Sequence, residues 1–338
     1  MSVYLSLIFS SFVFSVMELF KDNRKNLYLK VIKKIYVFIL FILFIFNRNN
    51  NDYQIYLKIF DGGYVKKEKG YLLFIKFIKS VGGNHNIVIL ISGMLLIYVL
   101  FFLYTKKNEI SFIFLYLLCG FVYDINQIRN LFCIMFILIG IKFLQKRKDC
   151  IYLIFNTLAS SFQSLGFVYF IFYFLQKIKL KKYFKIVTIL FIFGFLLTPI
   201  FPKIITFISP KKAVYYLSLK PRFGMLLYYI FIAMDIFMLK YKNRITKKDI
   251  LLIKFILFPI VFLPYSFLFL EIIHRIWRNT LYIKWFYLLK DLENEKKKYI
   301  IFILLISQQI MFISANFIKS NEAVINLLSQ VGNLGFYF

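Results

Sequence analysis

The sequence predicts an all-α protein, a polytopic integral membrane helical bundle with about 10–12 membrane segments. Hydrophobic residues occupy 61% of the 338 positions, and the mean hydropathy is +0.74. A soluble domain cannot bury that much apolar surface. The apolar residues form long runs, which short segments rich in Lys and Arg interrupt at every second turn. These basic segments predict the cytoplasmic side, where Lys and Arg are retained.

The net charge of +29 does not indicate nucleic-acid binding. The basic residues are spread over short loops instead of being gathered in one domain, as is typical of membrane topology. We therefore expect a single transmembrane domain over residues 1–338 and no nucleic-acid partner. The three cysteines have no disulfide or metal spacing. Since no acidic cluster indicates a divalent metal either, we expect no metal and no cofactor.

The first two spans differ in how well they match the membrane, since a helix needs about 20 residues to cross ~30 Å of hydrocarbon. Val3–Phe20 is long enough, whereas Ile35–Phe46 becomes so only by recruiting part of the basic segment 21–34. The polar stretch 47–86 after the second span is the longest in the chain, and we predict it to be an outer-face loop. It contains weakly amphipathic pieces such as 71–81, which are candidates for interfacial helices.

The middle of the chain predicts shorter crossings. Ile87–Tyr104 is a third span, and Ile110–Leu144 is apolar at both ends with the polar phrase 123–130 between them. That pattern predicts two short spans joined on the outer side. The run Cys150–Gln176 is too long for one upright span and too short for two. Its basic flanks fit a hairpin that enters and leaves on the cytoplasmic side, with residues 160–164 at the tip, and a tightly packed pair of short spans fits equally well.

The second half alternates in the same way between apolar runs, outer turns and basic segments. In order these are the run Ile186–Ile208, the outer loop 209–224, a span to Leu239, the basic segment 240–248, an apolar stretch to Leu270, the phrase 271–279, a span to the basic segment 290–298, and the run Tyr299–Ile318. We predict that the phrase 271–279 turns the chain at the outer face.

Arg129 is the first candidate for function, because ionisable residues at a membrane edge are costly and usually functional. It lies between two apolar runs, beside Gln127, and its planar guanidinium suits a diphosphate. Asp124 lies five residues upstream and is a candidate ion-pair partner. The alternative interpretation is an arginine that snorkels from a helix end.

Arg275 and Arg278 are the second candidates. They are three residues apart and would share one face of a helix, with Glu271 on the same side and His274 adjacent. Two inward-facing arginines suit a pyrophosphate or an acidic sugar. The alternative is interfacial anchoring together with Trp277.

The outer stretch predicts a sugar-binding surface. Asp52 and Tyr56 are one helical turn apart, with Tyr53 between them, and Glu68 and Tyr71 follow. Carboxylate oxygens bind sugar hydroxyls, tyrosine rings stack on a pyranose, and a carboxylate can deprotonate an acceptor hydroxyl. The alternative is an ordinary solvated loop.

Two further polar side chains complete the candidates. Gln163 lies among serines at the predicted hairpin tip, where it can form hydrogen bonds. Arg222 lies in the outer loop and is a secondary candidate for binding an anion.

Together these motifs resemble the EpsG-type family of membrane proteins, which belong with the Wzy-like polysaccharide polymerases. The family has an outer-face Asp-Tyr-x-x-Tyr followed by Glu-x-Gly-Tyr, then a short motif centred on an arginine, and a late arginine near the outer face. Here these match 52–56, 68–71, 126–130, and Arg275 or Arg278. The family's His-Ser motif differs, since Gln163 replaces the histidine, which removes proton transfer and leaves hydrogen bonding.

The resemblance covers most of the chain and implies a glycosyltransferase that polymerises oligosaccharide repeat units into a capsule, O-antigen or exopolysaccharide. The expected partners are an undecaprenyl-diphosphate-linked oligosaccharide, the lipid bilayer and a chain-length regulator. The expected location is the bacterial inner membrane, with the site at its outer face. Asp52, Glu68 and Asp124 are the candidate bases. The arginines Arg129, Arg275 and Arg278 would stabilise the leaving diphosphate.

Other classes remain open. A flippase or transporter of the lipid-linked oligosaccharide would use the same arginines, although the sequence lacks the repeat symmetry common in transporters. A membrane acyltransferase usually depends on a histidine, and the chain has only His85 and His274. A non-catalytic assembly subunit is the remaining alternative.

Overall fold

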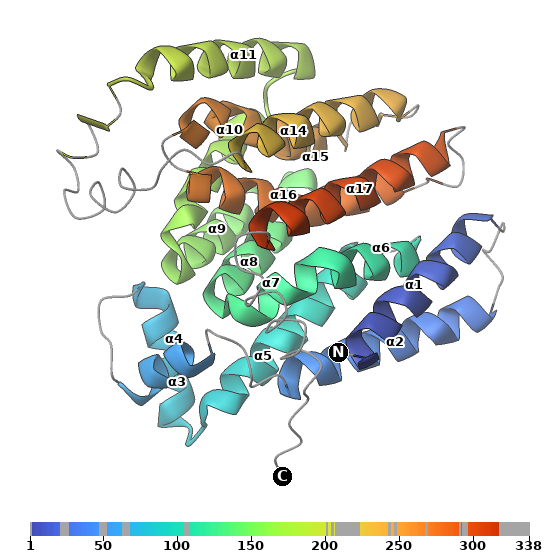
Figure 1. The fold of residues 1–338 in the computed structure, drawn as a ribbon. Coiled ribbons are helices and arrows are strands. Elements are labelled where there is room, and N and C mark those ends of the chain that lie inside the picture. The colour runs from blue at the N-terminus through green and yellow to red at the C-terminus, as the bar shows by residue number, and fades with distance from the viewer. Residues whose placement is uncertain are drawn as a thin grey trace. The chain divides into compact units, whose positions relative to one another are not determined.

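The computed structural model describes residues 2–20, 27–46, 53–62, 68–104, 108–200, 202–203, 206, 224–242, 245–246, 249–267, 270–290, 292 and 297–317. Its regular elements are helices, and no strand occurs within these ranges (Figure 1). The predicted all-α membrane fold is confirmed. Asp52 and Arg222 lie outside the described residues.

The chain divides into two compact units. Unit 1 comprises 1–173, 289–298 and 317–338, and unit 2 comprises 174–288 and 299–316. The helices up to the boundary are α1 (Ser2–Phe20), α2 (Leu27–Phe46), α3 (Tyr53–Asp61), α4 (Lys69–Ser80), α5 (His85–Ile97), η1 (Tyr98–Tyr104), α6 (Glu109–Leu115), η2 (Tyr116–Gly120), α7 (Phe121–Asn126), α8 (Ile128–Gln145), α9 (Asp149–Phe162), η3 (Ser164–Ile171) and α10 (Phe172–Leu175). Those that follow are α11 (Leu180–Leu197), α14 (Gly224–Tyr241), α15 (Asp249–Leu257), η4 (Phe258–Phe267), α16 (Leu270–Leu289) and α17 (Lys298–Phe317). The single transmembrane domain stays a prediction.

Four helical segments in the described chain are long and apolar enough to cross a membrane. They are His85–Tyr104, Glu109–Asn126, Ile128–Gln145 and Asp249–Ser266. Helix α2 begins at Leu27, so it does recruit part of the preceding basic segment. The total of 10–12 segments stays a prediction.

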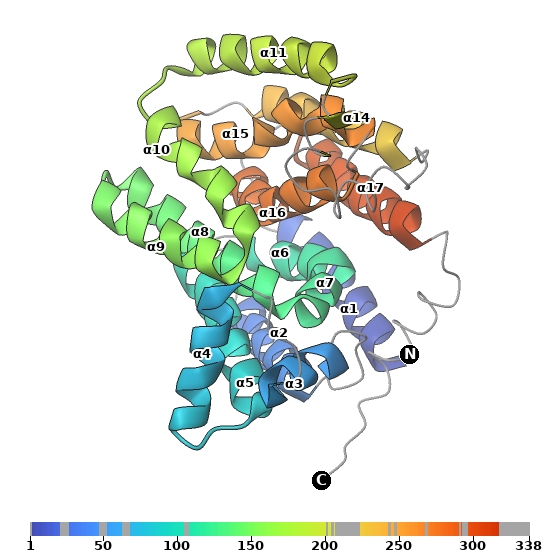
Figure 2. The same cartoon turned by 90° about the vertical axis from the view of Figure 1, so that its left-hand side faces the viewer.

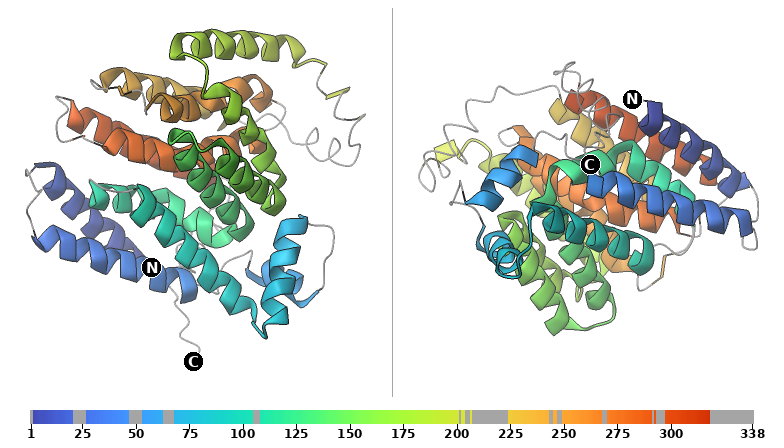
Figure 3. Two further views of the ribbon diagram at one scale, coloured as in Figure 1. Left: turned by 180° about the vertical axis from the view of Figure 1, so that it is seen from behind. Right: turned by 90° about the horizontal axis from the view of Figure 1, so that it is seen from below.

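Unit 1 is held together by helix pairs from different parts of the sequence. Helix α8 packs along α9, α1 packs against α6, and α2 packs against α5 (Figure 3). The carboxylate of Glu18 on α1 accepts hydrogen bonds from the backbone nitrogens of Ile110 and Ser111, at 3.3 and 2.8 Å. These nitrogens belong to the first turn of α6, where they have no partner within the helix. The cap therefore fixes α6 against α1.

The predicted outer stretch contains two short helices. Helices α3 and α4 fall within 47–86, and α4 packs against both α5 and α9 (Figure 2). Tyr56, Tyr71 and Ile75 are buried on their inner faces. Their position at a membrane interface stays a prediction.

The segment after α8 folds back on itself near residues 160–164, as both predicted arrangements require. Helix α9 ends at Phe162, Gln163 is extended, and η3 packs back on α9. The close return requires a glycine, because a Cβ on Gly166 would lie 2.6 Å from the backbone nitrogen of Ser160. The 14 residues of α9 span about 21 Å, less than the hydrocarbon thickness.

One prediction for the second half was wrong. The phrase 271–279 is not a turn, since it lies inside the continuous helix α16. Ile273, Ile276 and Trp277 recur at helical spacing and are buried, so packing favours a helix despite the charges. Helix α11 ends at Leu197, and residues 202–203 and 206 of the same apolar run are again helical.

Candidate functional site

Arg129 and Glu68 form the centre of a polar cluster in unit 1. One guanidinium nitrogen of Arg129, Nη1, donates to the Oε2 atom of Glu68 in an ion pair. The chain breaks its helix at Gln127, with φ −121° and ψ 62°, so that Arg129 lies in the first turn of α8. Glu68 directly precedes α4. The ion pair thus joins two helix starts.

Two tyrosines support the guanidinium. The Cζ atom of Arg129 lies 5.8 Å from the ring centroid of Tyr56, within the range of a cation–π contact. The backbone nitrogen of Arg129 also donates to the Tyr56 hydroxyl, at 3.5 Å. The Tyr71 ring lies 5.8 Å from the Tyr56 ring, edge to face. Tyr56 therefore sits between the arginine and a second aromatic layer.

The Tyr71 side chain is fully buried, at 0% exposure, and its ring contacts Phe162 on α9 at 6.3 Å. Its hydroxyl has no hydrogen-bond partner in the described part of the chain. Burial raises the pKa of this hydroxyl, the nearby Tyr56 raises it further, and Arg129 opposes the shift. The Tyr71 hydroxyl is therefore a buried polar group on the side chain that packs against Tyr56.

Gly70 allows this arrangement. A Cβ at position 70 would lie 2.1 Å from the Oγ atom of Ser161 and 2.8 Å from its carbonyl carbon. Because Gly70 has no side chain, the backbone of α4 approaches α9 closely enough for Tyr71 to reach Phe162. The Glu-x-Gly-Tyr spacing at 68–71 thus places the carboxylate of Glu68 and the ring of Tyr71 on either side of the close contact between α4 and α9.

The cluster is accessible at its charged end. The side chains of Arg129 and Glu68 are 21% and 26% exposed. The Nε atom of Arg129 is buried and has no hydrogen-bond partner among the described residues. A partly exposed guanidinium can bind an anionic oxygen in addition to Glu68.

Asp124 is placed differently from our expectation. Among the described residues, the ion-pair partner of Arg129 is Glu68 and not Asp124. Asp124 is buried on α7 and accepts a hydrogen bond of 3.0 Å from the Tyr116 hydroxyl. The helix break at Gln127 separates Asp124 from Arg129, whereas packing of α4 brings the distant carboxylate of Glu68 to the arginine.

The remaining candidates of unit 1 lie on neighbouring elements. Tyr53 on α3 is half-buried, and its ring lies 5.3 Å from the imidazole of His85. Gln127 is half-buried at the junction of α7 and α8. Gln163 is half-buried at the hairpin tip, and its carbonyl accepts from Gly166 at 2.8 Å.

The sequence suggested a role for His85 only in the acyltransferase alternative, and the structure places this residue near the candidate site of unit 1. It begins α5 and is 3% exposed, and neither ring nitrogen has a hydrogen-bond partner in the described chain. Its ring is enclosed by Tyr53 and Phe60 on α3. A buried, unpaired imidazole costs free energy, which marks it as a further polar group near the predicted sugar-binding tyrosines.

Unit 2 contains the second group of candidates, on α16. The Nδ1 atom of His274 lies 2.7 Å from the Tyr228 hydroxyl on α14, and its ring stacks on Phe312 of α17 at 5.1 Å. Arg278 is buried at 1% exposure, and Arg275 is half-buried. The structure thus gathers His274 and its neighbouring arginines on a helix packed among aromatic rings. The side chain of Glu271 lies outside the described residues.

The sequence interpretation missed three polar residues of unit 2. Asp235, Lys284 and Gln308 are fully buried and form one hydrogen-bonded network. Each lies in the middle of an apolar run, and that position is itself a signal for function in a membrane protein. The three residues are spread over three separate apolar runs, and the sequence gives no sign that these runs meet.

Comparison with known proteins gives one match. The model of the EpsG family matches residues 30–329. This region includes every candidate of both units. No curated protein and no solved structure matches the chain.

Proposed function

The chain belongs to the EpsG family of polysaccharide polymerases, and from that premise we propose that it joins undecaprenyl-diphosphate-linked oligosaccharide repeat units into a surface polysaccharide. The reaction would take place at the outer face of the bacterial inner membrane. The observation that carries this proposal is the Arg129–Glu68 pair, a partly exposed cation and carboxylate seated on tyrosine rings.

The reaction needs a cation for its leaving group. The acceptor hydroxyl attacks the anomeric carbon of the donor, the bond from that carbon to the diphosphate oxygen breaks, and undecaprenyl diphosphate leaves. Negative charge grows on the diphosphate in the transition state. A preorganised guanidinium stabilises such charge more effectively than water does. Arg129 provides it, since its guanidinium is partly exposed beside Glu68.

The same reaction releases one proton, which a carboxylate can accept. Glu68 uses Oε2 to hold Arg129 and keeps Oε1 for a sugar hydroxyl. Of the two carboxylate candidates that the structure describes, Glu68 is the better placed, since Asp124 is buried against Tyr116. The half-buried Tyr53 would offer its ring to the sugar, whereas Tyr56 is buried and supports Arg129.

The arginines of unit 2 are further candidates for binding an anionic group of the substrate. Arg275 and Arg278 lie three residues apart on α16 beside His274, and they suit the diphosphate or an acidic sugar. The lipid bilayer holds the undecaprenyl chain, and a chain-length regulator is a proposed partner.

The test is Arg129→Ala in cells that lack their own polymerase. We expect loss of polymer, with single lipid-linked repeat units accumulating on the outer leaflet, where membrane-impermeant periodate oxidises their sugars in intact spheroplasts. The matched control is Arg147→Ala, which removes an exposed arginine just after the other end of α8. This control should make normal polymer.

Three results would contradict the proposal. Single units confined to the inner leaflet would indicate a flippase instead of a polymerase. Loss of the Arg129→Ala protein from the membrane would assign the arginine a structural role. Normal polymer in Arg129→Ala would exclude the arginine from the reaction.

A further inference from the structure

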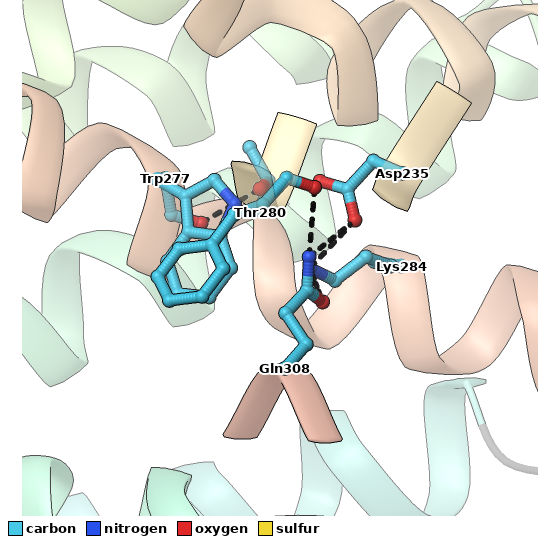
Figure 4. A network of polar contacts seen from close by, with 6 residues as sticks. Asp235, Trp277, Thr280, Lys284 and Gln308 are labelled. Atoms are coloured by element: carbon cyan, nitrogen blue, oxygen red, sulfur yellow. Dashed lines mark hydrogen bonds and ion pairs between the residues drawn. The ribbon is translucent and has the colours of Figure 1, made fainter. Parts of the chain in front are cut away.

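Asp235, Lys284 and Gln308 form a buried polar network inside unit 2 (Figure 4). The Nζ atom of Lys284 on α16 donates to the Oδ1 atom of Asp235 on α14, at 3.1 Å, and to the Oε1 atom of Gln308 on α17, at 2.6 Å. The Nε2 atom of Gln308 donates to the same Asp235 oxygen and to the carbonyl of Phe231, both at 2.9 Å. All three side chains are 0% exposed.

Stability alone does not account for this network. Two opposite charges taken out of water lose their hydration, and an apolar set of similar volume often gives equal or greater stability. Ionisable residues within membrane helices are also rare and usually serve function. The network can instead fix how three helices pack, because α14, α16 and α17 must adopt one register for all its hydrogen bonds to form.

The network touches the aromatic packing around the candidate site. The Nζ atom of Lys284 lies 4.4 Å from the Trp277 ring, two helical turns earlier on α16. Trp277 stacks on Phe231 at 4.7 Å and contacts Phe312 at 4.8 Å. The other neighbour of Phe312 is the His274 ring, stacked at 5.1 Å.

A continuous series of contacts therefore runs from the ion pair through Trp277 and Phe312 to His274. Arg278 directly follows Trp277 in the sequence, and His274 and Arg275 lie three and two residues before it. Any rotation of α16 that broke the network would move these three side chains together.

We propose that Asp235, Lys284 and Gln308 are positioning residues, which fix the register of α16 against α14 and α17 and so hold His274, Arg275 and Arg278 toward the substrate diphosphate. This inference rests on the proposed function for the identity of the substrate. The positional claim itself concerns only unit 2.

The test replaces the whole network with apolar residues in the variant Asp235→Leu/Lys284→Met/Gln308→Met. This change leaves no buried charge without a partner, so we expect the protein to accumulate in the membrane like the wild type. Polymer formation should fall by about 10- to 100-fold, since small misplacements of binding groups cause losses of that order. Equal accumulation with wild-type polymer would overturn the proposal.

A second readout does not depend on the reaction. Arg275→Cys is labelled with a maleimide in a Cys150→Ser background, which removes the exposed natural cysteine and leaves the buried Cys119 and Cys133. The labelling rate should shift when the network is made apolar. Because labelling reports the position of α16, it separates failure of this inference from failure of the proposed polymerase activity.

The matched control is Lys254→Met. Lys254 is also fully buried in unit 2, but it binds the carbonyls of Leu175 and Ile178 instead of residues on α14, α16 or α17. We expect lower accumulation and an unchanged labelling rate at position 275. An equal shift in Lys254→Met would show that labelling follows general loosening of the fold, which would also overturn the proposal.

If the triple variant does not accumulate, Gln308→Met decides the question. It keeps the Asp235–Lys284 pair and removes one helix from the network. Lower polymer per molecule together with a shifted labelling rate supports the proposal. Wild-type values for both would overturn it.

Discussion

Arg129 forms its ion pair with Glu68, a residue 61 positions earlier in the chain, and not with the nearby Asp124. The pair brings the start of α8 to the start of α4. It is also the point at which two of the family's motifs meet, so its chemistry can be tested separately from its effect on stability.

We expect Glu68→Gln, Arg129→Gln and the double variant each to lose polymer while the protein stays folded. The two side chains are 21% and 26% exposed, and such pairs contribute about 0–1 kcal/mol to stability. The measurement is a double-mutant cycle on thermal unfolding of detergent-purified protein, with polymer assayed in cells. A coupling free energy of several kcal/mol would indicate a structural pair.

Gly70→Ala tests the close approach of α4 to α9. The new Cβ would lie 2.1 Å from the Ser161 hydroxyl and 2.8 Å from its carbonyl carbon, and such overpacking costs about 1–3 kcal/mol. We expect a lower unfolding temperature and less polymer. Leu73→Ala, at an exposed position of the same helix, is the control and should change little. Equal unfolding temperatures for Gly70→Ala and the wild type would refute the close contact.

Tyr228→Phe tests the orientation of His274. The variant removes the hydroxyl that lies 2.7 Å from Nδ1 of His274, and a hydrogen bond of this kind contributes about 0.5–1.5 kcal/mol. The neighbouring Tyr229→Phe is the control, because it also removes a hydroxyl, which donates to the Leu263 carbonyl at 3.2 Å. Polymer should fall in Tyr228→Phe alone. A similar loss in both variants would mean that only packing is affected.

Arg275→Lys tests bidentate binding of the diphosphate. An ammonium group cannot reproduce the planar fork of a guanidinium, so we expect a large loss of polymer without loss of protein from the membrane. Arg147→Lys, at an exposed position, should behave like the wild type. Polymer of normal length in Arg275→Lys would exclude a bidentate role.

Local sequence patterns determined the helices and the membrane character of the chain. Hydropathy predicted the spans 85–104 and 298–317 to within two residues. The polar phrase 123–130 correctly marked a break, which lies at Gln127. These features depend on the composition of a short window and on helical periodicity. The order of the motifs also pointed to the family, because the residues are read directly from the chain.

The tertiary structure decided which of these residues meet. Charge alone allowed Arg129 to pair with Asp124 or Glu68, and only the packing of α4 on α9 selects Glu68. The phrase 271–279 looked like a turn because it is charged, yet neighbouring rings on α14 and α17 keep it helical. Pairing of distant groups depends on how helices pack, and the free energy of that packing is not contained in any one segment. The sequence by itself therefore named the candidate residues, and the fold assigned their partners.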